Sequence, residues 1–139
     1  MDIVKCELKD VPVLARLNKQ LIEDEKSDNP MNIRELEERM RGFLGVDYQA
    51  YFFETDGVIV GYALVKTTCN PVYLRQFLID RGFRHRHYGR EAFQALMGRL
   101  GVEAIDIEVL AWNEAGKRFW ESCGFTDISR YMRYKREKS

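Results

Sequence analysis

The spacing of apolar residues along the chain predicts alternating helices and strands. Apolar side chains recur at helical intervals in three stretches, from Asp10 to Ile22, from Ile33 to Leu44 and from Tyr88 to Leu100. Asp10 is expected to cap the first of these helices, and Asn113 is expected to cap a last helix that stops at Gly124. Strand-forming residues gather in shorter runs, at 3–8, 49–54, 58–67, 72–80 and 103–110, and residues 125–134 could add one or two closing strands.

The order of these elements indicates a mixed α/β fold. The strand 72–80, the helix 88–100 and the strand 103–110 form a βαβ unit, so its two strands should run parallel through a right-handed crossover. The dipeptide Asp56-Gly57 is typical of a tight hairpin, which makes the earlier strands antiparallel. We therefore expect a mostly antiparallel sheet with a central parallel strand pair. Residues 1–139 are expected to form a single domain.

The composition excludes several classes of partner. Lysine and arginine total 22, as do aspartate and glutamate, so no global charge attracts nucleic acid or a membrane. No apolar run approaches the roughly 18 residues that span a bilayer, and residues 1–5 lack the apolar core of a signal peptide. Three cysteines are too few for a disulfide framework or a CxxC metal site. We expect a cytoplasmic protein with no metal.

One segment departs from this charge balance. Residues 81–90 hold four arginines and two histidines and contain no acid. The segment opens a helix, whose first N–H groups are unpaired and whose dipole is positive at that end. Backbone amides, dipole and guanidinium groups together suit a phosphate, although a solvated basic loop is the alternative. The sequence contains neither a P-loop motif nor a GxGxxG dinucleotide motif.

Two motifs in the chain resemble those of the GNAT superfamily of acyl-CoA-dependent N-acyltransferases. The run Arg84-His85-Arg86-His87-Tyr88-Gly89 is similar to the family signature Q/R-x-x-G-x-G/A. The run from Asn113 to Phe125 resembles N-x-x-A-x-x-F-Y-x-x-x-G-F, and the element order agrees over nearly the whole chain. The chain departs from these motifs at three positions, with His87 at the first glycine, Gly116 at the alanine and Trp120 at the tyrosine.

The resemblance implies that acetyl-CoA is the co-substrate and lies where the two parallel strands separate. The backbone of strand 72–80 would pair with the pantetheine arm, and a backbone N–H near Leu78 would stabilise the oxyanion of the reaction. The amides that open the helix at 88 would hold the pyrophosphate, and Asn113 would bond the pantetheine arm. The implied cofactor-binding residues are Phe77, Leu78, Ile79, Arg84, His85, Arg86, His87, Tyr88, Gly89, Arg90, Asn113 and Trp120.

The implied reaction is direct attack of a neutral primary amine of a small molecule or peptide on the thioester. Glu108 is the candidate general base, because a glutamate five residues before the helix-capping asparagine serves as base in some family members; a solvent-facing strand residue is the alternative. With Trp120 at the usual tyrosine, Tyr73, Tyr131 or water could protonate the leaving thiolate, or the thiolate could leave unaided. Trp120 would then serve packing alone.

The acceptor is the least constrained feature of the sequence. The segment after the first helix commonly borders the acceptor in this fold, and here it holds Glu23-Asp24-Glu25 and Asp28. Carboxylates would favour a cationic amine, although such a run can also be a solvated helix end. Tyr48, Tyr51 and Tyr62 line either the pocket or the core. A catalytically silent acyl-CoA-binding regulatory or interaction module is the alternative function, and homodimers are common in the superfamily.

Overall fold

The computed structural model describes residues 1–137 of the chain. The first compact unit runs from Met1 to Glu108, and a second begins at Val109. The expectation of a single domain stays a prediction. None of the described helices is both long and apolar enough to cross a membrane.

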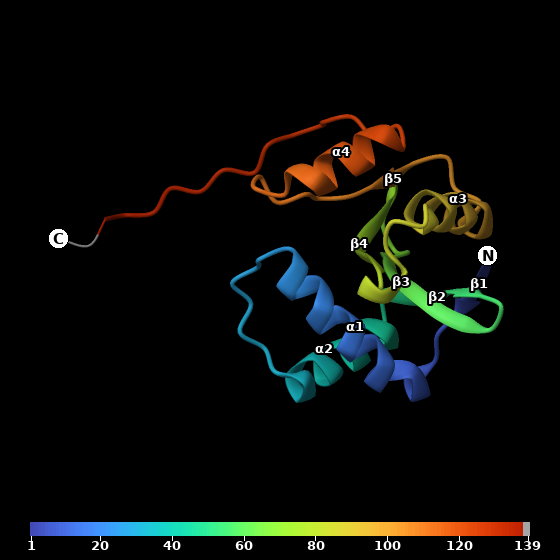
Figure 1. The fold of residues 1–139 in the computed structure, drawn as a ribbon. Helices are drawn as coiled ribbons and strands as arrows, with labels where there is room; N and C mark the ends of the chain where they lie inside the picture. The colour runs from blue at the N-terminus through green and yellow to red at the C-terminus, as the bar shows by residue number, and fades with distance from the viewer. Residues whose placement is uncertain (138–139) are drawn as a thin grey trace. The chain divides into compact units, whose positions relative to one another are not determined.

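The first unit is a five-stranded sheet with three helices (Figure 1). Its strands lie in sequence order, all antiparallel to their neighbours except the last pair, which is parallel. The expected mixed α/β class is therefore confirmed. The elements are β1 (Asp2–Lys5), α1 (Val11–Asp24), α2 (Ile33–Gly45), β2 (Tyr48–Thr55), β3 (Val58–Lys66), β4 (Val72–Ile79), α3 (Tyr88–Leu100) and β5 (Ile105–Asp106), with 3₁₀ turns η1 (Leu8–Asp10) and η2 (Arg81–Phe83).

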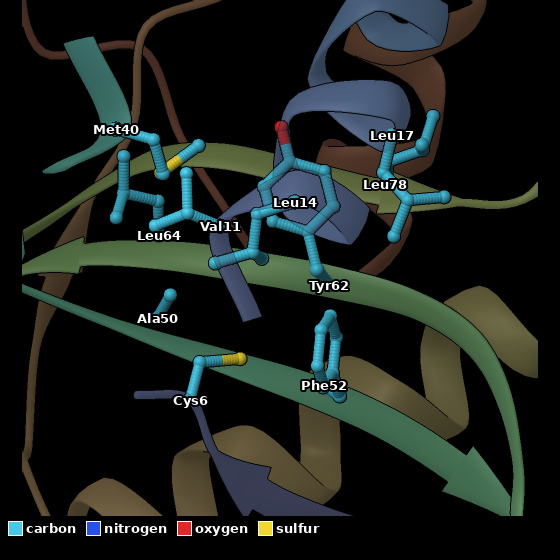
Figure 2. Packing of buried hydrophobic residues seen from close by; sticks show 10 residues of the cluster. All are labelled: Cys6, Val11, Leu14, Leu17, Met40, Ala50, Phe52, Tyr62, Leu64 and Leu78. Carbon is cyan, nitrogen blue, oxygen red and sulfur yellow. The ribbon is translucent and has the colours of Figure 1, made fainter. Parts of the chain in front are cut away.

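Helices α1 and α2 cover one face of the sheet, and α3 lies on the other (Figure 1). The apolar positions of α1 and α2 meet every second residue of the strands, because side chains alternate between the faces of a sheet. Figure 2 shows this cluster, to which the helices contribute Val11, Leu14, Leu17 and Met40. Asn32 starts α2 through a reciprocal cap, in which its Oδ1 accepts from the Glu35 amide at 2.9 Å and its own amide donates to Glu35 Oε1.

Three expectations about local structure are wrong, the first of them only in part. Asp10 occupies the N-cap position of α1 as expected, but its side chain makes no cap hydrogen bond there, because its carboxylate accepts from the Glu7 amide at 2.8 Å within η1. The strand expected at 103–110 is reduced to Ile105–Asp106, since only these two residues pair with β4. Residues 125–137 contain no strand, and their apolar side chains Ile128, Tyr131 and Met132 are exposed rather than packed in a sheet.

Cys6 lies in the core beneath α1, where it is 6% exposed. Burial raises the pKa of its thiol far above the ordinary value, and the nearby Asp10 raises this pKa further. A buried, protonated thiol is unreactive. We therefore expect a disulfide reagent at pH 8 to modify Cys69 and Cys123 in the native protein, and Cys6 only after unfolding in guanidinium. Equally fast modification of Cys6 in the native protein would contradict its placement.

Candidate active site

The two parallel strands of the sheet are joined only at one end. β4 pairs with β5 through Val72 and Tyr73 alone, opposite Ile105 and Asp106. From Leu74 onward β4 has a strand neighbour on its β3 side only, within residues 1–137. A strand edge of this kind offers N–H and C=O groups to an added strand or to an amide-rich ligand.

The direction of the backbone groups along β4 decides which residues face this open edge. The carbonyl of Leu78 lies against Gly61 of β3, and the amide of Asp80 donates to the Val60 carbonyl at 2.8 Å. Alternate residues of an antiparallel strand direct both backbone groups to the same neighbour. Phe77 and Ile79 therefore direct their backbone N–H and C=O groups to the open edge, whereas the amide of Leu78 points towards β3.

A β-bulge at Arg75 changes which side chains of β4 face α1 and α2. Gln76 lies opposite Leu64, but Leu74 lies opposite Val65, so Arg75 is an extra residue without a partner of its own. Because of this extra residue, Tyr73 and Gln76 both stand on the face that α1 and α2 cover. The Tyr62 hydroxyl donates to Gln76 Oε1 at 2.7 Å and links this point of β4 to the core.

The basic segment after β4 forms a 3₁₀ turn followed by two residues in left-handed backbone conformations. Asp80 starts η2 by accepting from the Gly82 amide at 3.2 Å. His85 and His87 both adopt left-handed backbone conformations, with φ of 63° and 61°. His87 precedes α3 without capping it through its side chain, so the first amides of this helix are left for another acceptor.

Two of the arginines in this turn bind α1. Arg81 contacts Glu23 and Asp24, each at 3.1 Å, and Arg84 contacts Asp24 as well. The Nε of Arg84 also donates to the Ile79 carbonyl at 3.1 Å. Glu23 and Asp24 are therefore neutralised by arginines and are not available to a cationic acceptor.

Arg86 differs from these two arginines. Its guanidinium lies over the Phe83 ring at 5.8 Å, and no acid lies within salt-bridge distance among the described residues. The side chains of His85, Arg86, His87 and Arg90 are exposed at the start of α3. Arg86 is therefore better placed than Arg84 to reach an anion at this helix end.

Gln20, which the sequence did not indicate, lies on α1 and forms hydrogen bonds to the turn after β4, about 60 residues later in the chain. Its Nε2 donates to Asp80 Oδ1 at 3.4 Å, and its Oε1 accepts from the Arg81 amide at 2.8 Å. Arg84 Nη2 approaches the same oxygen at 3.4 Å. No local sequence signal marks such a residue, because glutamine on a helix is ordinarily a surface residue.

Titratable groups gather around Tyr73, where the parallel strands separate. Burial raises the pKa of Tyr73, and Glu108 and Glu25 raise it further, whereas Arg75 lowers it. Burial raises the pKa of Glu25 too, with a smaller contribution from the adjacent Asp24. A half-buried carboxyl group with a raised pKa is a candidate for acid–base chemistry. The sequence places Glu25 only in the acidic run after the first helix and does not indicate this role.

The three candidate pocket tyrosines have different environments. Tyr62 is fully buried within the core, and Tyr51 is buried with its hydroxyl donating to Gln49 at 2.6 Å. Tyr48 is half-buried and accepts a hydrogen bond from Arg75 at 3.4 Å. Of the three, Tyr48 lies beside the cluster around Tyr73.

In the second unit, α4 (Glu114–Ser122) begins at Asn113 as expected. Asn113 Oδ1 accepts from the Gly116 amide at 3.0 Å, and a Cβ at Gly116 would lie 2.4 Å from Asn113 Nδ2. The glycine at this position therefore accommodates the cap. The Trp120 ring packs edge-on against Phe119 and Phe125, at centroid distances of 4.8 and 5.3 Å, which favours a packing role.

Comparison with known proteins identifies this architecture. The family model described as acetyltransferase (GNAT) family matches residues 15–125. The chain belongs to the GNAT family. No curated protein matches the chain by sequence.

Solved GNAT-like structures show the same fold. A possible acetyltransferase from Clostridium difficile is 14% identical, with a TM-score of 0.78 over 99% of this chain and 97% of that one. An aminoglycoside N-acetyltransferase in complex with CoA is 17% identical, with a TM-score of 0.73 and coverage of 99% and 95%. A predicted acetyltransferase from Clostridium acetobutylicum, solved with acetyl-CoA, is 15% identical, with a TM-score of 0.73 and coverage of 96% and 95%.

Acetyl-CoA is the co-substrate of the GNAT family, and the departure of this chain at His87 is compatible with its binding. The first glycine of the family signature is replaced by a histidine that still adopts a left-handed conformation. Histidine is among the residues that enter this region more readily than most. The left-handed conformation at His87 is one that glycine also adopts readily.

Proposed function

We propose that this GNAT protein is an acetyl-CoA-dependent N-acetyltransferase that acetylates a primary amine. The observation that carries the proposal is the open edge of β4, which leads from the bulge at Arg75 to the uncapped start of α3. The pantetheine arm of CoA is extended, carries amide groups and ends in a diphosphate. The strand edge can pair with the amide groups, and the helix N-terminus can bind the diphosphate.

In the proposed complex, both backbone groups of Phe77 and the amide of Ile79 pair with the pantetheine arm. The Ile79 carbonyl already accepts from Arg84 Nε at 3.1 Å. Acetyl-CoA supplies a thioester, which is activated towards attack by an amine. The open-edge amides next to Leu78, rather than the amide of Leu78 itself, stabilise the oxyanion that forms on the carbonyl. Amides from Arg86 to Arg90, with the Arg86 side chain, hold the diphosphate.

Glu108 is the proposed general base, acting directly or through water on the protonated amine. It is exposed beyond the end of β5 and lies close enough to Tyr73 to raise the pKa of that phenol. Tyr73 is the proposed donor to the leaving thiolate, because its phenol is protonated near neutral pH and it stands at the point where the parallel strands separate. Glu25, on the α1 side of Tyr73, together with Glu108 attracts a cationic amine.

The function is tested by calorimetric titration with acetyl-CoA, followed by thiol release in the presence of a panel of primary amines. We expect saturable binding and an amine-dependent release of one CoA thiol per acetylated amine. Binding without turnover of any amine would instead support the silent acyl-CoA-binding module. Absence of acetyl-CoA binding at millimolar protein would contradict both functions.

The diphosphate site makes a separate prediction. Replacing Arg86 and Arg90 together by glutamine should weaken acetyl-CoA binding by about 1–3 kcal/mol, because charged hydrogen bonds to the anion are lost. Calorimetry measures the change, and Arg16→Gln, an exposed arginine on α1, is the matched control. An unchanged affinity in the double variant would refute the assignment of residues 84–90 to the diphosphate.

A further inference from the structure

Two arginines from different elements contact one aromatic ring on the face of the sheet that α1 and α2 cover. The guanidinium carbons of Arg39, from α2, and Arg75, from the β4 bulge, lie 5.4 and 4.8 Å from the centroid of the Phe43 ring. Arg75 also lies 5.9 Å from the Tyr48 ring and donates to its hydroxyl. The two positive charges therefore share the Phe43 ring as a neighbour, and the charge of Arg75 acts on Arg39.

Within residues 1–137 no acid neutralises these two charges. In the described part of the chain, no carboxylate comes within salt-bridge distance of either guanidinium. Arg39 donates from Nη2 to Asn18 Oδ1 at 3.0 Å, but its buried Nε has no hydrogen-bond partner. Burial and the charge of Arg75 lower the pKa of Arg39. A nearby like charge disfavours the charged form of each group, and an anion bound between them would relieve this repulsion.

The arginine pair lies next to the groups proposed to handle the amine. Arg75 is two residues from Tyr73 on β4, and its charge acts on the same phenol as Glu25 and Glu108. One side of this region is therefore acidic and suits a protonated amine. The other side carries guanidinium groups, which bind carboxylate or phosphate oxygens in a forked geometry.

We propose that Arg39 and Arg75 bind an anionic group, a carboxylate or a phosphate monoester, on the acceptor, so that the acceptor is an amine that also carries a negative charge. Amino acids and peptides with a free carboxylate near the amine are the first such class, and phosphorylated amines are the second. The inference rests on the proposed function, because it concerns the acceptor of the same site.

The test uses ligands that need no turnover. Wild-type protein saturated with CoA is titrated by calorimetry with N-acetylmethionine and N-acetyllysine, and with the corresponding neutral amides. N-acetylphosphoethanolamine and N-acetylethanolamine form the phosphate arm. We expect the anionic member of at least one pair to bind about tenfold more tightly than its neutral partner. The ligand series that shows this preference, carboxylate or phosphate, identifies the anionic group that the two arginines bind.

The variants Arg75→Gln and Arg39→Gln should each abolish the preference for the anionic ligand. Arg75 is exposed on the bulge, so its variant keeps the test valid if the partly buried Arg39 proves necessary for folding. Arg41→Gln, which removes an arginine of α2 that pairs with Glu37, is the matched control and should keep the preference.

Equal affinity for anionic and neutral ligands, no binding of any ligand at about 10 mM, or an equal loss in Arg41→Gln would overturn the inference. These results leave the proposed function standing if CoA itself binds. Failure of acetyl-CoA to bind, with the anion preference intact, would contradict the proposed function and support the arginine site alone.

Discussion

Replacing Glu108 by glutamine should lower kcat for amine acetylation by about 100- to 10,000-fold, the range that removal of a general base produces. Glutamine keeps the size of the side chain but cannot accept the proton of the attacking ammonium group. The affinity for acetyl-CoA should stay unchanged, because Glu108 lies beyond β5 and contributes no charge to the diphosphate site. Steady-state kinetics with the best amine, together with calorimetry, measure both quantities.

Glu103→Gln is the control for this prediction, since Glu103 is an exposed glutamate on the same approach to β5. It should leave kcat within a factor of about two, as for a surface residue. Glu25→Gln tests the competing assignment of Glu25 as the general base, because Glu25 also raises the pKa of Tyr73. A large loss in Glu25→Gln with near-normal activity in Glu108→Gln would move the base to the end of α1.

Replacing Gly61 by alanine should both destabilise the protein and disturb the cofactor edge. A Cβ at Gly61 would lie 2.1 Å from the Leu78 carbonyl oxygen and 3.1 Å from the Ile79 Cα. Both atoms belong to the backbone of β4, so the strand itself has to move. Overpacking of this kind costs about 1–3 kcal/mol. Urea unfolding should show this loss, and acetyl-CoA should bind more weakly to the displaced strand.

Gly98→Ala is the matched control, because a Cβ at Gly98 meets nothing within 4 Å in the interior of α3. This variant should gain about 0.5–1 kcal/mol of stability, since alanine is favoured over glycine in a helix. A Gly61→Ala protein as stable as the wild type would show that β3 and β4 are not packed as closely as described.

The sequence was most informative where the pattern is local. Apolar spacing placed α1, α2 and α3 within a residue or two of their ends, and Asp56-Gly57 marked the hairpin between β2 and β3. Each of these signals depends on neighbours along the chain. The family motifs were equally local, and they indicated the turn before α3 and the cap at Asn113.

The errors came from features that depend on distant partners. Residues 103–110 have the composition of a strand, but a strand needs a hydrogen-bonded neighbour, and only Ile105–Asp106 has one. The same holds for 125–134. Asp10 has the right residue type for a side-chain helix cap, yet its carboxylate accepts from the Glu7 amide at the start of η1 instead.

The candidate site was predicted in outline but not in its partners. The sequence presents Glu23-Asp24-Glu25 as one acidic cluster, whereas two of its members pair with Arg81 and Arg84 and the third acts on Tyr73. The pairing of Arg39 with Arg75 joins a helix to a strand bulge. Bulge position and long-range contacts of this kind are set by tertiary packing, which one sequence does not display.

Titration of ¹⁵N-labelled protein with CoA, followed through backbone amide shifts, tests the central claim most directly. The account predicts that the amides of Phe77 and Ile79 and those of residues 86–90 move together at one affinity, while the amide of Leu78, directed at β3, moves less. Shifts confined to residues outside β4 and the start of α3, or no shift at saturating CoA, would contradict it.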